Sequence, residues 1–152
     1  MIVYRLARQT FIHDLSGYGA EKTGGRWNSK GRAVLYTAAS RALAMVEVAV
    51  HVPLGIIPIN YFIASIDIPD KDILKLKESD LPDNWNSNPF TKNTQLIGDD
   101  FLRKADHLVL QVPAASVAGD FNYLINPRHP DFNKVKNKSI DPFEFDVRLF
   151  KR

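Results

Sequence analysis

The sequence predicts an α+β protein with a mostly antiparallel sheet, on the evidence of three observations. Residues 2–8, 61–68 and 107–113 alternate between two sets of side chains with the period of two that strands show. Residues 42–50 form the one strong helical pattern. The expected strands do not alternate regularly with helices, which disfavours a parallel βαβ arrangement. The length of 152 residues fits one domain, 1–152.

The N-terminal part begins with the expected strand 2–8, which places Arg5 on an otherwise apolar face. An arginine there either extends to solvent or meets an anion, and both readings stay open. Residues 13–22 are polar and contain glycine, so we expect a loop. Gly24-Gly25 then predicts a tight turn, because glycine adopts backbone conformations closed to other residues.

A short strand and a helix are expected next. Val34-Leu35-Tyr36 is apolar and either β-branched or aromatic, which indicates a short buried strand. Thr37 or Ser40 can cap the helix that follows, and Pro53 ends it. The helical spacing puts one apolar face at Ala42, Met45, Val46, Ala49 and Val50.

The second half of the chain is less regular, and residues 70–95 have mixed character. Trp85 in that region is expected to be a packing anchor, with a ligand contact as the lesser alternative. The later elements expected are a short helix at 98–104, a strand at 107–113, a short strand or bend at 122–126 and a half-solvated strand at 143–150.

The composition excludes several classes of protein. Hydrophobic content of 45% and charged content of 24% are typical of a globular chain. There is no cysteine, no apolar run near the roughly 20 residues that span a bilayer, and no signal-peptide pattern at the start, so we expect a cytoplasmic protein. The net charge of +3 comes without a basic helix, which disfavours nucleic-acid binding. No metal is expected, because the histidines lack close paired spacing: His13, His51, His107 and His129.

Glu47 is the one acidic residue of the expected helix, and its neighbours leave little polar surface around it. A carboxylate in such surroundings is unfavourable unless it is paired or hydrogen-bonded. Two readings follow. Either Glu47 lies at the solvent edge or pairs with an arginine, or it belongs to a functional site.

The order of the motifs resembles the RES domain family, which is named for an arginine, a glutamate and a serine. The resemblance runs from about Tyr4 to about Asp131 and covers most of the chain. Its specific elements are Gly24-Gly25-Arg26-Trp27-Asn28 and Asn122-Tyr123-Leu124-Ile125-Asn126-Pro127. Weaker matches lie between them, at Val34 to Ala38, Ala44 to Glu47, Leu81-Pro82 with Trp85, Gly98-Asp99 and Val112-Pro113.

The resemblance implies a fold similar to that of ADP-ribosyltransferases, in which two small sheets pack around a cleft that binds NAD. It also implies a toxin that degrades intracellular NAD, with NAD as substrate and no metal. The implied partner is an Xre-type helix-turn-helix antitoxin that occludes the cleft within a hetero-oligomer. Hydrolysis, phosphorolysis and transfer of ADP-ribose to a protein stay open. A non-enzymatic nucleic-acid-binding module is the alternative from another class.

If the cleft holds NAD, the residue types suggest roles. Glu47 would stabilise the positive charge that develops on the ribose. Arg26, with Arg5 second, would bind the pyrophosphate, because a guanidinium is a planar, bidentate donor. Tyr36 would offer a flat face to the nicotinamide cation. Each has a plain alternative: Arg26 could stack on an aromatic ring and Tyr36 could be core. Asn122 is either a turn-former, as Asn126 is expected to be, or a contact to NAD.

One position departs from the family pattern. RES domains usually carry serine after the Val-Pro of the later strand, but Val112-Pro113 is followed here by Ala114, and serine comes only at Ser116. Three explanations stay open: the natural protein lacks the serine, Ser116 replaces it from the same face of an extended strand, or a deliberate Ser→Ala change attenuates a toxic activity. Our hypothesis is the third, because the other motifs are well kept. Ala114 is therefore included among the expected NAD-contacting positions.

Overall fold

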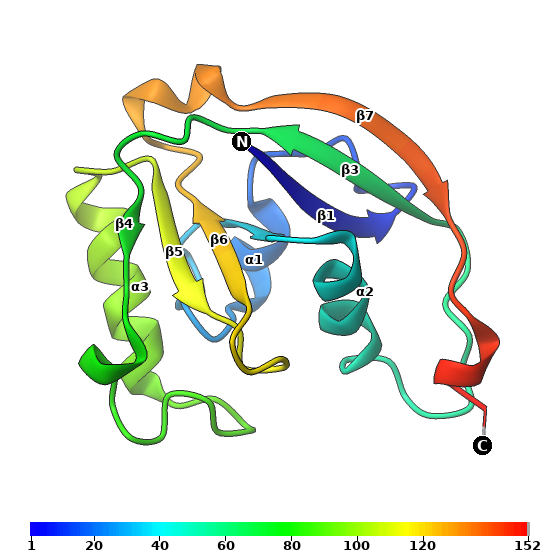
Figure 1. Ribbon diagram of the computed structural model, residues 1–152. Coiled ribbons are helices and arrows are strands. Elements are labelled where there is room, and N and C mark those ends of the chain that lie inside the picture. The colour runs from blue at the N-terminus through cyan, green and yellow to red at the C-terminus, as the bar shows by residue number, and fades with distance from the viewer. Residues whose placement is uncertain (152) are drawn as a thin grey trace.

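The computed structural model describes residues 1–151. Within these residues one sheet carries the order β4-β5-β6-β2-β1-β3-β7 (Figure 1). The strands are β1 (Ile2–Arg8), β2 (Leu35–Ala38), β3 (Tyr61–Asp67), β4 (Leu74–Lys75), β5 (Val109–Pro113), β6 (Phe121–Ile125) and β7 (Lys136–Phe143). Every neighbouring pair is antiparallel except β4 and β5, which are parallel. The predicted α+β class with mostly antiparallel pairing is confirmed.

The sheet has two halves that meet at one point. β1 pairs with β3 along its whole length, from Ile2↔Asp67 to Arg8↔Tyr61. β1 and β2, in contrast, are joined only at Tyr4↔Ala38. The expected pair of small sheets is therefore present as two halves, β4-β5-β6-β2 and β1-β3-β7, linked through that position rather than fully separate.

Three α-helices accompany the sheet in the described chain: α1 (Tyr18–Thr23), α2 (Arg41–Ala49) and α3 (Lys92–Lys104). Short 3₁₀ turns lie at Glu78–Asp80, Pro130–Lys134 and Val147–Leu149. α3 runs beside β4 and β5, while β7 forms the opposite edge of the sheet (Figure 1). Nowhere in residues 1–151 is a helix both long and apolar enough to cross a membrane.

α2 begins where a side chain caps it, but its packed face differs from the expected one. Ser40 is the cap, since its hydroxyl oxygen accepts a hydrogen bond from the Leu43 amide at 3.0 Å. Leu43 and Ala44 are buried, whereas Ala42 and Val50 of the expected face are exposed. Because almost every residue of this helix is apolar, the sequence pattern could not determine which face packs against the sheet.

Two other expectations about local structure are wrong. Residues 13–22 were expected to be a loop, yet α1 begins at Tyr18, after Gly17 in a left-handed conformation. The strand expected at 143–150 is absent: β7 ends at Phe143, and a 3₁₀ turn follows at Val147–Leu149. β7 was missed because it is an exposed edge strand whose polar residues show no apolar alternation. The short helix expected at 98–104 is the C-terminal part of α3, which starts earlier, at Lys92.

The core comprises three clusters, one of which lies under the candidate site. In that cluster Trp27, Val34 and Leu110 pack with Trp85 and Phe101. Trp85 is only 8% exposed, so its expected role as a packing anchor is confirmed.

Candidate active site

A cleft of about 820 Å³ opens between the two halves of the sheet and is also lined by α1, α2 and the turn at 24–27. Five of the six residues expected at the site line it: Arg5, Arg26, Tyr36, Glu47 and Asn122. They come from β1, the glycine turn, β2, α2 and β6, so the fold brings together residues that lie far apart in the sequence.

Glu47 is held in place by two neutral donors. The Ser116 hydroxyl donates to Glu47 Oε1 at 2.8 Å, and the Asn122 amide nitrogen donates to the same oxygen at 2.7 Å. Within residues 1–151 no hydrogen bond engages Glu47 Oε2 and no arginine forms an ion pair with this carboxylate. The side chain is partly buried, not at the solvent edge. Its orientation is therefore set through one oxygen, and the other remains available as an acceptor.

Asn122 is thus not a turn-former. It belongs to β6, pairs with Ala38 and Val112, and uses its side chain on Glu47. Asn126, in contrast, behaves as expected of a turn residue, because its Oδ1 accepts from the Arg128 amide at 3.0 Å.

Arg26 connects the glycine turn to the loop that precedes α3. Its Nη1 donates to the carbonyl oxygens of Trp85 at 2.8 Å and Ser87 at 2.9 Å. The guanidinium carbon lies 6.0 Å from the centre of the Phe90 ring. Burial lowers the pKa of Arg26, and the nearby charge of Glu47 opposes that shift. Since Nη1 makes both of these bonds, the other guanidinium nitrogens can still serve as donors to an anion.

Tyr36 is both structural and part of the cleft. Its hydroxyl donates to Asn28 Oδ1 at 2.8 Å and accepts from the Trp27 amide at 3.0 Å. Burial raises the pKa of this phenol above its usual value. A Cβ on Gly25 would lie 2.8 Å from the Tyr36 hydroxyl, so the turn needs glycine there. The hydroxyl is used to hold the turn, which leaves the ring as the part that faces a ligand.

α3 holds the same turn from the other side. Gln95 Nε2 donates to the Gly25 and Asn28 carbonyls at 3.0 and 3.1 Å. Asp99 accepts from the Ser29 amide at 2.9 Å and from its hydroxyl at 2.6 Å. The position of Arg26 is therefore determined by Tyr36 on one side and by α3 on the other.

Arg5 lies on the β1 wall of the cleft. Its Nη1 donates to the carbonyls of Phe11 at 3.0 Å and Ile12 at 3.1 Å, which fixes the loop after β1. Burial lowers its pKa, and the charge of Asp14 opposes the shift. Arg5 is thus half-buried beside the cleft, with its guanidinium bonded to backbone carbonyls.

Ala114 is the one expected site residue that does not line the cleft. It is 3% exposed and packs with Leu6, Ala38 and Leu43 in the core. The expectation that residues 114 and 116 share a strand face is wrong, because β5 ends at Pro113 and the chain then bends. Ser116 reaches Glu47 all the same, which supports a role for Ser116 in place of the missing serine, while the attenuating Ser→Ala change at Ala114 stays a hypothesis.

His51 is a cleft residue that the sequence interpretation missed. Its Nδ1 lies 2.7 Å from the backbone carbonyl oxygen of Glu47, one helical turn earlier. A carbonyl only accepts, so Nδ1 must carry the proton, and in the neutral ring Nε2 is then an acceptor. The spacing of four residues from Glu47 was the available signal.

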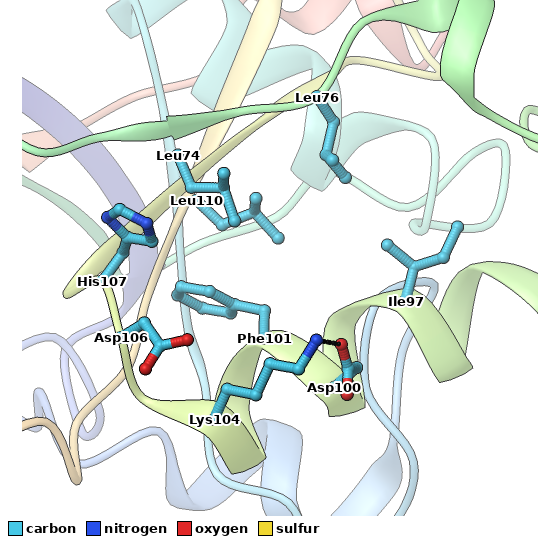
Figure 2. A pocket seen from close by; sticks show the side chains of 9 residues that line it. All are labelled: Leu74, Leu76, Ile97, Asp100, Phe101, Lys104, Asp106, His107 and Leu110. Atoms are coloured by element: carbon cyan, nitrogen blue, oxygen red, sulfur yellow. Dashed lines mark ion pairs between the residues drawn. The ribbon is translucent and has the colours of Figure 1, made fainter.

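A second, smaller cavity of about 310 Å³ lies between β4, β5 and α3 (Figure 2). The side chains that line it are mainly apolar, including Leu74, Ile97 and Phe101. Two charged side chains that also line it form an ion pair with each other, Lys104 Nζ with Asp100 Oδ2 at 2.6 Å. None of the expected site residues lines it. Nor do residues 1–151 contain a group of three His, Cys, Asp or Glu side chains placed to hold a metal ion.

Comparison with known proteins shows the family of this chain. Residues 2–147 match the RES domain. The chain belongs to the RES domain family. The protein named Toxin Res from Yersinia enterocolitica is 39% identical over 152 residues, which cover 98% of this chain and 99% of that one. The Prs ADP-ribosylating toxin of Sphingobium sp. is 35% identical and aligns over 96% and 92% of the two chains.

The fold also matches a solved structure. A chain from the M. tuberculosis MbcT–MbcA toxin–antitoxin complex superposes with a TM-score of 0.75 at 21% identity, covering 98% of this chain and 86% of that one. This likeness concerns the fold alone: the chain shares the fold of that chain.

Proposed function

We propose that this protein is the toxin of a toxin–antitoxin pair and that it degrades NAD by breaking the bond between nicotinamide and ribose. The observation that carries the proposal is the placement of Glu47, oriented by Ser116 and Asn122 in a cleft that two arginines also line. The names of the relatives, Toxin Res and Prs ADP-ribosylating toxin, support it. A cleft of about 820 Å³ falls within the range of small-molecule sites.

The chemistry follows from the charges. As the nicotinamide–ribose bond breaks, its electron pair moves to the pyridinium nitrogen, and the ribose carbon becomes cationic. Glu47 Oε2 would stabilise that cation or hold a ribose hydroxyl, since Oε1 is occupied by its two donors. An oxygen nucleophile then bonds to the carbon and loses a proton. His51 Nε2, in the turn that follows α2, is the candidate acceptor for that proton.

The remaining parts of NAD would be bound by the other cleft residues. Arg26 and Arg5 supply the positive charge for the pyrophosphate. Tyr36, whose hydroxyl is already used, would pack its ring against nicotinamide near Glu47. The proposal involves no metal and places the protein in the cytoplasm, where its substrate is.

The proposed partner is an antitoxin that occludes the cleft, of the Xre helix-turn-helix type. The solved relative comes from a toxin–antitoxin complex. The cleft lining also includes exposed apolar side chains at Tyr18, Val50 and Phe90, which a protein partner would cover.

A second candidate activity is transfer of ADP-ribose to a protein. The name of the Sphingobium relative favours it. The same cleft residues would serve, because the two reactions differ only in the nucleophile that attacks the ribose carbon.

Product analysis tests the proposal and separates the reactions. The purified chain is incubated with NAD carrying a labelled adenosine moiety, with and without phosphate, alone and with a bacterial extract. Free nicotinamide with ADP-ribose indicates hydrolysis, and a phosphate-dependent phosphorylated product indicates phosphorolysis. Label on protein indicates transfer. Intact NAD in every arm, with the chain folded and free of a partner, would exclude all three.

A further inference from the structure

The loop of residues 86–90 forms one wall of the cleft beside Arg26. Asn86, Asn88, Pro89 and Phe90 all line the cleft and are exposed, and Phe90 is 43% exposed despite its large apolar ring. None of residues 86–90 is charged. This uncharged wall differs from the side of the cleft that carries the Glu47 carboxylate.

The loop is anchored at both ends. Trp85, which precedes it, is buried in the core, and α3 begins at Lys92 just after it. Arg26 donates to the carbonyls of Trp85 and Ser87, and the Ser87 hydroxyl donates to the Pro89 carbonyl at 3.0 Å. The side chains on the wall are therefore presented by a loop that is already ordered, which lowers the entropy lost when a ligand binds.

The chemistry of the wall fits a neutral aromatic base. An exposed aromatic ring is a stacking platform for any base, and asparagine amides can pair with the edge of adenine. The positively charged nicotinamide ring suits this wall poorly, because Arg26 lies 6.0 Å from the Phe90 ring and the loop supplies no negative charge. The same arginine suits a phosphate attached to the base through ribose.

We propose that residues 86–90 form the subsite for the adenine half of the dinucleotide, with Phe90 stacking on the base and Asn86 or Asn88 bonding its edge. This inference rests on the proposed function, and it assigns the two halves of NAD to opposite parts of the cleft. Nicotinamide lies at Tyr36 and Glu47, and adenine lies at the 86–90 loop.

The test compares two substrates that share the scissile bond. NAD contains adenine, and nicotinamide mononucleotide does not. Phe90→Ala should raise KM for NAD by roughly five- to 150-fold, as loss of one base–aromatic stack does, with kcat nearly unchanged. It should leave both constants for nicotinamide mononucleotide unchanged. Phe90→Tyr should retain the wild-type KM, and Phe11→Ala, which removes a 56% exposed ring outside the cleft, is the matched control.

A binding measurement separates failure of this inference from failure of the proposed function. AMP is titrated calorimetrically into the wild-type chain and into Phe90→Ala, with folding of each checked by thermal unfolding. Weaker AMP binding by the variant supports the subsite even if no NAD is consumed. Equal AMP binding by both chains, or an equal loss of activity toward both substrates, would overturn it. If Phe90→Ala fails to fold, AMP binding is measured with Asn88→Ala instead, and weaker or equal binding has the same meaning as for Phe90→Ala.

Discussion

Replacing Gly98 by alanine is expected to displace the turn that carries Arg26. A Cβ at this position in α3 would lie 1.7 Å from the Trp27 carbonyl oxygen and 2.6 Å from its carbonyl carbon. A normal nonbonded contact needs roughly 3.5 Å, so the helix and the turn would have to separate by more than about 1 Å. The obstacle is backbone, which no side-chain rotation can relieve. We therefore expect a loss of stability of about 3 kcal/mol or more, at the upper end for overpacking.

The assay is thermal unfolding, with Gly19→Ala as the matched control. Gly19 is also helical, and a Cβ there meets nothing within 4 Å. The control should be neutral or more stable by about 0.5–1 kcal/mol, because alanine favours the helix. For a chain of this size, about 3 kcal/mol corresponds to a fall in Tm of roughly 6–12 °C. If Gly98→Ala unfolds at or above the wild-type temperature, the close contact between α3 and the turn is not as described.

Three further predictions concern the donors to Glu47, the Tyr36 hydroxyl and the position of Ala114. Ser116→Ala and Asn122→Ala should each lower kcat/KM for NAD by about 10- to 100-fold, since each removes a hydrogen bond to a charged group. In the double variant kcat/KM should fall by less than the product of the two single-variant factors, because both donors serve one oxygen of Glu47. A fall equal to that product would contradict this coupling. Tyr36→Phe should make stability less dependent on pH above 10. The folded phenol has a raised pKa, so the unfolded chain releases its proton first and the wild-type free energy of unfolding falls as pH rises above 10; urea midpoints at pH 9 and 10.5 that shift equally in both proteins would refute this. Ala114→Ser should not raise NAD turnover, because it buries a hydroxyl in the core, at a loss of about 1–3 kcal/mol visible in the urea midpoint; increased turnover would support the attenuation hypothesis.

The strands that pair over a long register were predictable from the sequence. β1 and β3 pair over seven residues and are rich in β-branched and aromatic side chains, although each buries residues on both faces, as Val3 and Leu6 do in β1. β7 was not predictable in this way, because its pairing to β3 depends on backbone hydrogen bonds and its side chains are mostly exposed. The alternation at 143–150 misled for a related reason. Phe145 and Phe150 do enter the core, but from the irregular segment after β7 and from the end of the 3₁₀ turn, while Val147 and Leu149 stay exposed.

At the site, the motif order placed Arg26, Tyr36 and Glu47 on one cleft, which the geometry matches. What the sequence could not supply is which atoms are already engaged. The Tyr36 hydroxyl is used by the turn, and Ser116 reaches Glu47 only because the chain bends after β5. The Ser116–Glu47 bond joins residues 69 positions apart, and no local pattern encodes it.

The most direct test of the central claim is a comparison of Glu47→Gln with wild type in both NAD binding and NAD turnover. Glutamine keeps the shape but removes the charge that should stabilise the cationic ribose. Glu144→Gln, at an exposed position away from the cleft, is the matched control. We predict that Glu47→Gln still binds NAD with a Kd within a few-fold of wild type but loses at least about 100-fold in turnover, while the control behaves as wild type. Turnover by Glu47→Gln equal to that of wild type would contradict the account.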